Sequence, residues 1–471
     1  MPAPRLADVT VAQARAEVPA YDRTRVRPSV VHIGLGAFAR AHLCVYLDDL
    51  LTRNTPELGV LGVSLRHHDV ATALVSQDGL YTLAVIDGER VLHRIIGSVL
   101  DVLHAPTRPM EVRAALAAPG TSIVSATVTE KGYCWDPASH RLDADHPDVR
   151  HDTAGPATPR SLAGHLVRAA ADRRASGTGG FTALSLDNLP SNGTTLRTVT
   201  LDLASLVDPT LVEWIEDNIA FPCSMVDRIV PATDDALRAE VATAIGVDDR
   251  WPVRAEPFSQ WVIERAWAGP LPPLESVGVT LVDDVTPWET LKLRVLNALH
   301  TSAAHFGLFA GLDTVDQVVA DPAGRALLTR VAADICAVLV PPTGVDPQAY
   351  VTTTLHRFAN AGLGHRCAQI ATDTSQKLPQ RLLDTVRARR AAGLDAGAIA
   401  EVLALWAWST RHPVHDPLAP TFAAIAARHG DDPAALVAAL VALTPIFGDL
   451  AGDIQLGAAV TARLQALSGR R

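Results

Sequence analysis

Two glycines near the start of the chain constrain the fold more than any other feature. Residues 30–33 form a short apolar segment of strand length, and after a tight turn residues 38–51 carry apolar side chains at helical spacing. Gly34, Gly36 and Ala39 therefore read G-x-G-x-x-A between a strand and a helix. In that setting, glycines let backbone N–H groups approach a pyrophosphate at a helix N-terminus. The motif predicts a dinucleotide-binding domain; the alternative is an ordinary tight turn between a strand and a helix.

A second apolar strand, residues 58–65, closes a βαβ unit of the expected length. In this class of domain an acidic residue after the second strand usually binds the adenosine ribose. Here the strand is followed by Arg66, His67, His68 and only then Asp69. Asp69, acting from a loop, suits the ribose of NAD, whereas Arg66 suits the 2′-phosphate of NADP, so both cofactors remain open. The alternative reading of these four residues is a solvated loop.

Two later apolar strands, residues 122–128 and 181–186, run directly into polar residues. The first is followed by Glu130 and the second by Asn188. Since ligands bind at the carboxyl edge of an open parallel sheet, both side chains are candidates for a binding site. The segment between the strands, residues 136–158, is rich in Asp, His and Pro and is expected to form a surface excursion.

The strand pattern fades from about residue 282. Alanine-rich amphipathic segments follow, at residues 322–340, 348–360, 378–392, 396–409, 433–443 and 453–467. We therefore predict an α/β fold. A Rossmann-type N-terminal domain, residues 1–280, is followed by a mainly α-helical C-terminal domain, residues 281–471.

Composition excludes several classes of function. A formal net charge of −10 without any run of Lys or Arg argues against a nucleic-acid partner. The chain has no long apolar stretch and no signal-peptide pattern, so we expect no membrane association and a cytoplasmic location. Five scattered cysteines, never spaced C-x-x-C, indicate a reducing compartment without a zinc site. We expect a monomer or a small homo-oligomer.

Residues 288–311 read as one long helix that is apolar almost all the way round and is therefore buried. Lys292, Asn297 and His300 interrupt it. At about 100° per residue, Asn297 lies about 140° and His300 about 80° round from Lys292, so all three share one arc. A buried lysine and histidine are costly unless a site uses them. The alternative is a snorkelling lysine at a helix end and a hydrogen-bonded core histidine.

Such a set suits hydride transfer from an alcohol, which needs a base for the hydroxyl proton and donors for the developing alkoxide. Lys292 can be the base if burial lowers its pKa. Asn188 and Asn297 can donate amide N–H groups, and His300 can bind a neighbouring hydroxyl. If a nicotinamide is bound by the first half, the active site is expected in the cleft between the halves. No metal is needed, since no His, Cys or Glu set has ligand spacing; the one pair that the sequence leaves open as metal ligands is Glu289 and His300.

The segment K-L-R-x-L-N-x-x-H at 292–300 resembles the signature helix of the polyol-specific long-chain dehydrogenases, the mannitol dehydrogenase family. The resemblance continues in order through residues 31–42, 77–83, 127–134, 185–193, 221–233 and 256–264. It implies a Rossmann-type domain, a helical C-terminal domain and metal-independent NAD(P) chemistry on a sugar acid or polyol.

The same resemblance assigns roles by position. Lys292 becomes the general acid/base, Asn188 and Asn297 the oxyanion partners, His300 a substrate contact and Glu130 a gate on the proton path to water. The residues expected to bind the cofactor, NAD with NADP not excluded, are Gly34, Gly36, Ala37, Phe38, Arg40, Asp69 and Asp227.

Residues 366–381 are similar to the fructuronate reductase branch, with QIA-x-D-x-SQKLPQR from Gln369 onward. The residues expected to contact substrate are Arg366, Gln369 and Lys377. A cluster of cationic side chains, His365, Arg366, Lys377 and Arg381, suits the carboxylate of a hexuronate. The alternative is that these arginines are exposed helix charges. Thr374, where the family commonly has glycine, is a departure that affects the local turn.

Four alternatives to a D-fructuronate/D-mannonate enzyme therefore remain. The substrate is a neutral polyol or ketose, such as mannitol and fructose, or another sugar acid. A protein of another class, a non-catalytic dinucleotide-binding sensor, would bind the cofactor without oxidising any substrate. A metal-dependent alcohol dehydrogenase would lose activity on chelation, and the cysteine pattern disfavours it.

Overall fold

The computed structural model describes residues 6, 15–55, 57–66, 68–136, 139–155 and 157–468. The chain divides into two compact units, Met1–Thr286 and Pro287–Arg471. A boundary after residue 280 stays a prediction.

The first unit is built on a five-stranded parallel sheet with β1 (Pro28–Ile33) at its centre. The chain adds strands on one side of β1, returns, and then adds strands on the other side, so the strand order reverses next to β1. In an open α/β sheet this reversal creates the ligand-binding crevice. The strand order is β5 (Val99–His104), β2 (Gly59–Ser64), β1, β6 (Ile123–Ala126) and β9 (Thr182–Ser185). The predicted Rossmann-type domain is confirmed.

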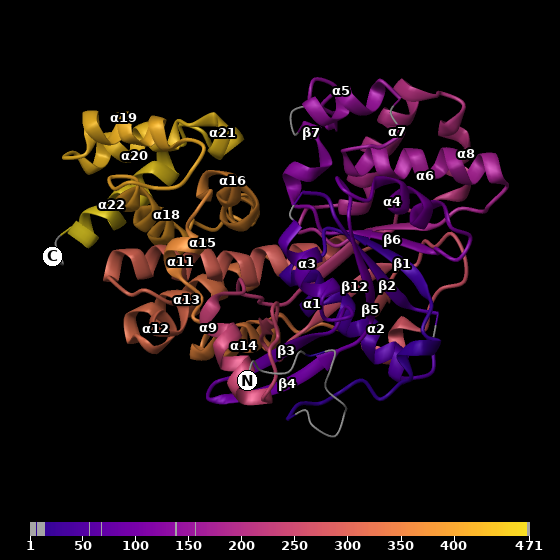
Figure 1. The fold of residues 1–471 in the computed structure, drawn as a ribbon. Coiled ribbons are helices and arrows are strands. Elements are labelled where there is room, and N and C mark those ends of the chain that lie inside the picture. Colours follow the sequence, from indigo (N-terminus) through magenta and orange to yellow (C-terminus); the bar gives the residue numbers. More distant parts are fainter. Residues whose placement is uncertain are drawn as a thin grey trace. The chain divides into compact units, whose positions relative to one another are not determined.

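Helices cover both faces of this sheet (Figure 1). Apolar side chains of the strands form one cluster with the helices on each face. One face packs against α1 (Ala37–Ala41), α2 (Leu43–Thr52) and α3 (His68–Val75). The other packs against α4 (Pro109–Ala117), α6 (Leu162–Ser176), α7 (Asn192–Val207) and α8 (Leu211–Asn218). Burial on both faces explains why the parallel strands read as short apolar runs without polar alternation.

The predicted helix over residues 38–51 is wrong in one respect, because it is two helices that meet at His42. His42 has non-helical backbone angles (φ −123°, ψ −83°). Its buried ring donates a hydrogen bond from Nε2 to the carbonyl of Gln260 (3.0 Å) and stacks on Phe38. The bond to Gln260, far away in the sequence, occurs at this break. The apolar pattern of residues 38–51 did not indicate the break, because that pattern is local.

Smaller sheets flank the main one. Antiparallel β3 (Tyr81–Asp87) and β4 (Arg90–Ile96) are joined by β11 (Val253–Ala255). β10 (Ser224–Asp227) pairs with β12 (Gln260–Glu264), which pairs with β13 (Thr280–Val282). The remaining strands and α-helices described in this unit are β7 (Trp135–Asp136), β8 (Arg141–Leu142), α5 (Pro147–Thr153) and α9 (Asp235–Ile245). The predicted surface excursion is therefore partly wrong, because α5 lies in it and buries Val149.

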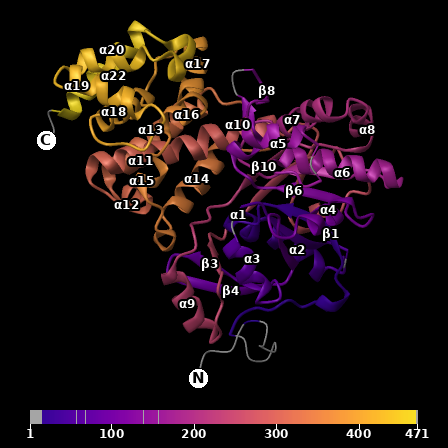
Figure 2. The ribbon, with the colours of Figure 1, turned by 45° about the horizontal axis from the view of Figure 1, so that its top comes forward.

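The second unit is helical, as predicted, and has its own apolar core. Figure 2 shows α18 (Ile399–Ser409), α20 (Pro433–Val441) and α22 (Ile454–Ser468) side by side. The other helices are α11 (Ala298–Ala310), α12 (Val315–Ala320), α13 (Pro322–Cys336), α14 (Pro347–Phe358), α15 (Cys367–Ile370), α16 (Thr374–Leu378), α17 (Asp384–Ala391), α19 (Ala419–His429) and α21 (Thr444–Phe447).

Within the described chain, no single helix is long and apolar enough to cross a membrane. One bent pair, Pro433–Val441 with Thr444–Leu450, meets the length and composition criteria only when the two helices are taken together.

Candidate active site

The glycine turn after β1 has the geometry that a dinucleotide requires. Gly34 has φ +92°, and a Cβ added there would lie 2.1 Å from the carbonyl oxygen of Thr127. Gly36 is exposed and extended, and a Cβ there would meet nothing closer than 3.8 Å. A side chain at Gly36 would therefore fill the open space above the turn, where a pyrophosphate approaches the backbone. This cradle fits a dinucleotide.

The residues after the turn differ in how they face solvent. Ala37 and Phe38 are half-buried at the start of α1. Arg40 is 0% exposed; its Nη1 donates to the carbonyl of Trp251 (2.5 Å), and its guanidinium lies 5.2 Å from the ring centroid of Tyr81. The predicted cofactor contact from the Arg40 side chain finds no support in this location, because the guanidinium is enclosed by protein beside β3 and β11.

The acidic candidates at the sheet edge occupy different settings. Asp69 is exposed in the first turn of α3, so its expected placement in a loop is wrong. Arg66 is exposed and its Nη2 lies 3.4 Å from a carboxylate oxygen of Asp148. His67 lies outside the described residues. Asp227 is buried at the end of β10, in register with Gln260 of β12.

Glu130 and Asn188 are both exposed, and one carboxylate, Asp187, braces the turns that carry them. Asp187 is buried and accepts hydrogen bonds from the backbone N–H groups of Val128 and Thr129, each at 2.9 Å. The hydroxyl of Tyr133 donates to the same carboxylate (2.8 Å). Burial raises the pKa of Asp187, and these donors oppose that shift. The sequence interpretation missed Asp187, although it directly precedes Asn188.

A second missed residue, Asn192, ties the end of β9 to β10. Its buried Nδ2 donates to the carbonyls of Asp187 (3.0 Å) and Ser224 (2.8 Å). Its Oδ1 accepts the backbone N–H of Ser224 (2.9 Å). A side-chain amide used fully by three backbone groups holds the loop that carries Asn188 in one place.

In the second unit, the predicted single helix over residues 288–311 is wrong, because it contains a π-helical turn. α10 (Thr286–Lys292) is followed by the π-helix Leu293–Asn297 and then by α11. The N–H of Ala298 donates to the carbonyl of Leu293, five residues back. This i→i+5 pattern widens the turn and brings Lys292 and Asn297, five residues apart, toward one side of the helix. Inserted π turns of this kind are frequent at functional sites.

The polar residues of this helix are buried, as predicted: Lys292, Asn297 and His300 are 7%, 6% and 8% exposed. Nδ2 of Asn297 and Nε2 of His300 have no hydrogen-bond partner within the described chain. An unsatisfied buried donor costs about 1–3 kcal/mol. A site that supplies the missing partner explains why such atoms are retained.

Aromatic rings enclose His300. Phe358 stacks on it with ring centroids 4.3 Å apart at 18°, and His365 meets it edge-on at 4.6 Å and 87°. Burial lowers the pKa of His300 well below its usual 6.5, and electrostatic interactions with His365, Arg381, Arg357 and Lys377 lower it further. His300 is therefore a neutral hydrogen-bonding group at physiological pH. Arg357 and Phe358, both on α14, were absent from the sequence interpretation.

The substrate residues proposed from the 366–381 segment separate in the structure. Arg366 is the N-cap residue of α15 and Gln369 lies within that helix, and both side chains are exposed. Lys377, in α16, donates from Nζ to the carbonyls of Ile370 (3.1 Å) and Thr372 (2.5 Å). Arg381, in the π-helix Pro379–Leu383, donates from Nη1 to Oγ1 of Thr301 (3.1 Å). The predicted cation cluster thus keeps His365, Lys377 and Arg381 near His300, whereas the side chain of Arg366 faces solvent.

Threonine at position 374 is accommodated without strain. The left-handed backbone angle in this turn belongs to the preceding residue, Asp373 (φ +50°). Thr374 is buried, and its hydroxyl donates to the carbonyl of Ala371 (2.7 Å). Glycine is therefore not required at position 374 in this chain.

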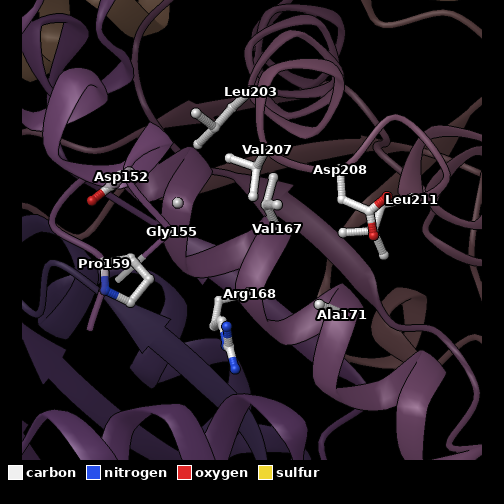
Figure 3. Close-up of a pocket in the computed structure, with 11 residues that line it drawn as sticks. Asp152, Gly155, Pro159, Val167, Arg168, Ala171, Leu203, Val207, Asp208 and Leu211 are labelled. Atoms are coloured by element: carbon white, nitrogen blue, oxygen red, sulfur yellow. The ribbon is translucent and has the colours of Figure 1, made fainter. Parts of the chain in front are cut away.

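Among the residues that the structure describes, no three His, Cys, Asp or Glu side chains are grouped as a metal site. Figure 3 shows a separate cavity of about 180 Å³ in the first unit. Its wall is mainly apolar, formed by α6, α7 and α8 through residues such as Val167, Leu203 and Leu211. None of the predicted site residues lines it.

Comparisons with known proteins bear on both units. The family model for the mannitol dehydrogenase Rossmann domain matches residues 28–276, and that for the mannitol dehydrogenase C-terminal domain matches residues 284–468. Among curated proteins, D-mannonate oxidoreductase of Escherichia coli is 40% identical over 467 residues, covering 96% of each chain. A mannitol 2-dehydrogenase of Phaeosphaeria nodorum is 40% identical over 383 residues, covering 80% of this chain and 67% of its own.

Two solved structures share the fold over nearly the whole chain. Mannitol 2-dehydrogenase of Pseudomonas fluorescens, solved as a ternary complex with NAD and D-mannitol, has a TM-score of 0.86 at 33% identity and covers 98% of this chain and 96% of its own. Substrate-free D-sorbitol dehydrogenase has a TM-score of 0.90 at 31% identity, and the match covers 99% of this chain and 98% of its own. The chain therefore belongs to the mannitol dehydrogenase family and is an oxidoreductase that acts on a CH–OH group.

Proposed function

We propose that this enzyme interconverts a keto sugar acid and its alcohol, D-fructuronate and D-mannonate, with NAD. The observation that carries the choice of an acid is the set of cationic side chains around His300, which includes Arg357, Lys377 and Arg381. A substrate carboxylate gains charge-assisted hydrogen bonds in such surroundings, and a neutral polyol does not. The likeness to D-mannonate oxidoreductase over 96% of the chain supports the same choice.

The cofactor is NAD, which accepts hydride from the carbon that bears the hydroxyl. The turn at Gly34 and Gly36, with Ala37 and Phe38 after it, would hold the pyrophosphate. Asp69 would accept hydrogen bonds from the ribose hydroxyls and repel a 2′-phosphate, which favours NAD over NADP. Asp227 is also proposed to contact the cofactor.

In the proposed reaction, Lys292 takes the hydroxyl proton as its neutral amine and returns it in reduction. Asn297, whose Nδ2 has no hydrogen-bond partner among the described residues, donates to the developing alkoxide, and His300 donates to a neighbouring hydroxyl. Asn188 is proposed as a second donor and Glu130 as a gate for proton exchange with water. Arg366, Gln369 and Lys377 remain proposed substrate contacts.

The test is a spectrophotometric panel of oxidation of NADH and NADPH with D-fructuronate, D-tagaturonate, D-fructose and D-xylulose. We expect the highest kcat/KM with D-fructuronate and NADH. Faster turnover of D-fructose would assign the chain to the neutral-polyol function, which the likeness to mannitol 2-dehydrogenases favours as second candidate. The cytoplasmic location and a monomeric or small homo-oligomeric state also remain predictions.

A further inference from the structure

His365 stands against the edge of the proposed substrate-binding histidine, and its backbone holds it there. The carbonyl of His365 accepts the N–H of Val315 (3.0 Å), and the N–H of Cys367 donates to the carbonyl of Asp313 (2.9 Å). Thr314 and Arg366 form the bridge between these two segments. These two bonds flank Arg366 and tie the backbone carbonyl of His365 to the start of α12, which fixes the position of the main chain beside the His300 ring.

The ring of His365 has hydrogen-bonding capacity that the protein does not use. Its Nδ1 is enclosed and has no hydrogen-bond partner within the described chain. Burial lowers the pKa of His365 to about 4, so the ring is neutral near pH 7 and carries one N–H. A ligand atom that reaches Nδ1 is shielded from water, which strengthens the bond that it makes.

Three cationic side chains, Arg357, Arg381 and Lys377, act on this pair, since each lowers the pKa of His300. Phe358 stacks on one face of the His300 ring and offers no hydrogen bond there. A carboxylate entering beside these rings meets several positive groups at once, whereas the hydroxymethyl group of a neutral ketose gains far less.

We propose that His365 is a specificity-determining residue, whose Nδ1 hydrogen-bonds the carboxylate of a sugar-acid substrate. The inference rests on the proposed function and deepens it: His300 binds the hydroxyl side of the substrate, and His365 recognises the acid. Arg366, its sequence neighbour, is exposed, so the discrimination falls on the half-buried ring of His365 with its enclosed Nδ1.

The experiment compares two variants with the wild-type holoenzyme on D-fructuronate and D-fructose. His365→Leu keeps bulk and removes the hydrogen bond, while His365→Asn keeps an amide donor near the position of Nδ1. We expect His365→Leu to raise KM for D-fructuronate roughly 10- to 100-fold, the range for a lost hydrogen bond to a charged group, with kcat little changed. KM for D-fructose should stay within about two-fold, and His365→Asn should recover most of the loss. His356→Leu, an exposed histidine on the adjoining α14, is the matched control.

The measured activities distinguish a failure of the role of His365 from a failure of the proposed function. If the wild-type enzyme reduces D-fructose and not D-fructuronate, both the proposed function and the role of His365 are wrong. A wild type active on D-fructuronate, with His365→Leu impaired equally on both substrates, overturns the role of His365 alone. Calorimetric binding of D-mannonate and D-mannitol to the enzyme–NAD complex gives a readout independent of turnover, with the selective loss expected for D-mannonate only.

Discussion

The carboxylate of Asp187 lies between the backbone N–H groups of Val128 and Thr129, accepting both at 2.9 Å. It thereby joins the end of β9 to the end of β6 and determines the path of the turn that carries Glu130. Thr129 has φ +63°, which is costly for a residue with a branched side chain. The bonds to Asp187 hold that conformation.

Asp187→Asn should therefore weaken this edge of the sheet. An amide presents N–H where the native turn needs an acceptor, so at least one backbone donor loses its partner. We expect the free energy of unfolding to fall by about 2–3 kcal/mol, measured by urea denaturation. Glu216→Gln, which removes an exposed ion pair with Arg197, is the control and should cost less than about 1 kcal/mol. Equal losses in the two variants would contradict the bracing role of Asp187.

Lys292→Ala should abolish turnover and spare cofactor binding. Loss of a general acid/base lowers kcat roughly 10²- to 10⁴-fold. Lys292→Arg should be similarly inactive, because a guanidinium stays protonated and cannot accept the hydroxyl proton. Fluorescence titration with NADH checks that the affinity for the cofactor is retained. A folded Lys292→Ala enzyme with near-normal kcat would remove the proposed mechanism.

Gly34→Ala and Gly36→Ala form a matched pair at the nucleotide turn. At Gly34 the added methyl meets the Thr127 carbonyl at 2.1 Å and φ is +92°, so the backbone must shift and stability should fall. At Gly36 the methyl enters open space, so stability should change by less than about 0.5 kcal/mol. Both variants should bind NADH more weakly, as measured by calorimetry. Unchanged NADH affinity in Gly36→Ala would argue against a pyrophosphate at this turn.

Acid should destabilise the first unit through His32. This side chain is fully buried in β1 between the hydroxyls of Ser125 (2.9 Å) and Thr127 (3.0 Å), and burial lowers its pKa from 6.5 to about 4. Between these two values the unfolded chain binds more protons than the folded one, so the stability that this neutral histidine contributes is present above about pH 6.5 and is lost as pH falls toward 4. The loss amounts to about 2 kcal/mol between pH 7 and pH 5.

Urea unfolding of the wild type and of His32→Asn across that pH range isolates the contribution of His32. The variant should be less stable at pH 7 and should show a flatter decline on acidification. His356→Gln, on the surface, should follow the wild type. If the slopes of all three proteins coincide, another group is responsible for the acid sensitivity.

Much of the architecture was predictable because it depends on local patterns. Four parallel strands appear within one or two residues of their apolar runs, and the Gly34 turn follows from a backbone angle that side chains rarely adopt. The helices of the second unit likewise follow the 3.6-residue period, with α13 and α18 close to their predicted ranges. Burial of Lys292, Asn297 and His300 was also predictable from the sequence, since the helix around them is apolar on almost every side.

Tertiary packing decided what those patterns leave open. The π-helix Leu293–Asn297 packs against the second π-helix Pro379–Leu383, and such contacts select an i→i+5 turn from a sequence that equally allows an α-helix. Arg40 points into protein, although its position after the glycine turn suggested a cofactor contact.

The neighbours of His300 show most clearly what local sequence patterns do not predict. Phe358 and His365 lie about sixty residues further along the chain, on α14 and just before the Thr314–Arg366 bridge, and the tertiary fold brings them beside it. The sequence by itself determined the domain types, the nucleotide turn and the buried polar helix, because each depends on interactions within a few residues. The surroundings of the proposed substrate site were decided by the tertiary structure alone, because they depend on which distant side chains share the space around one imidazole.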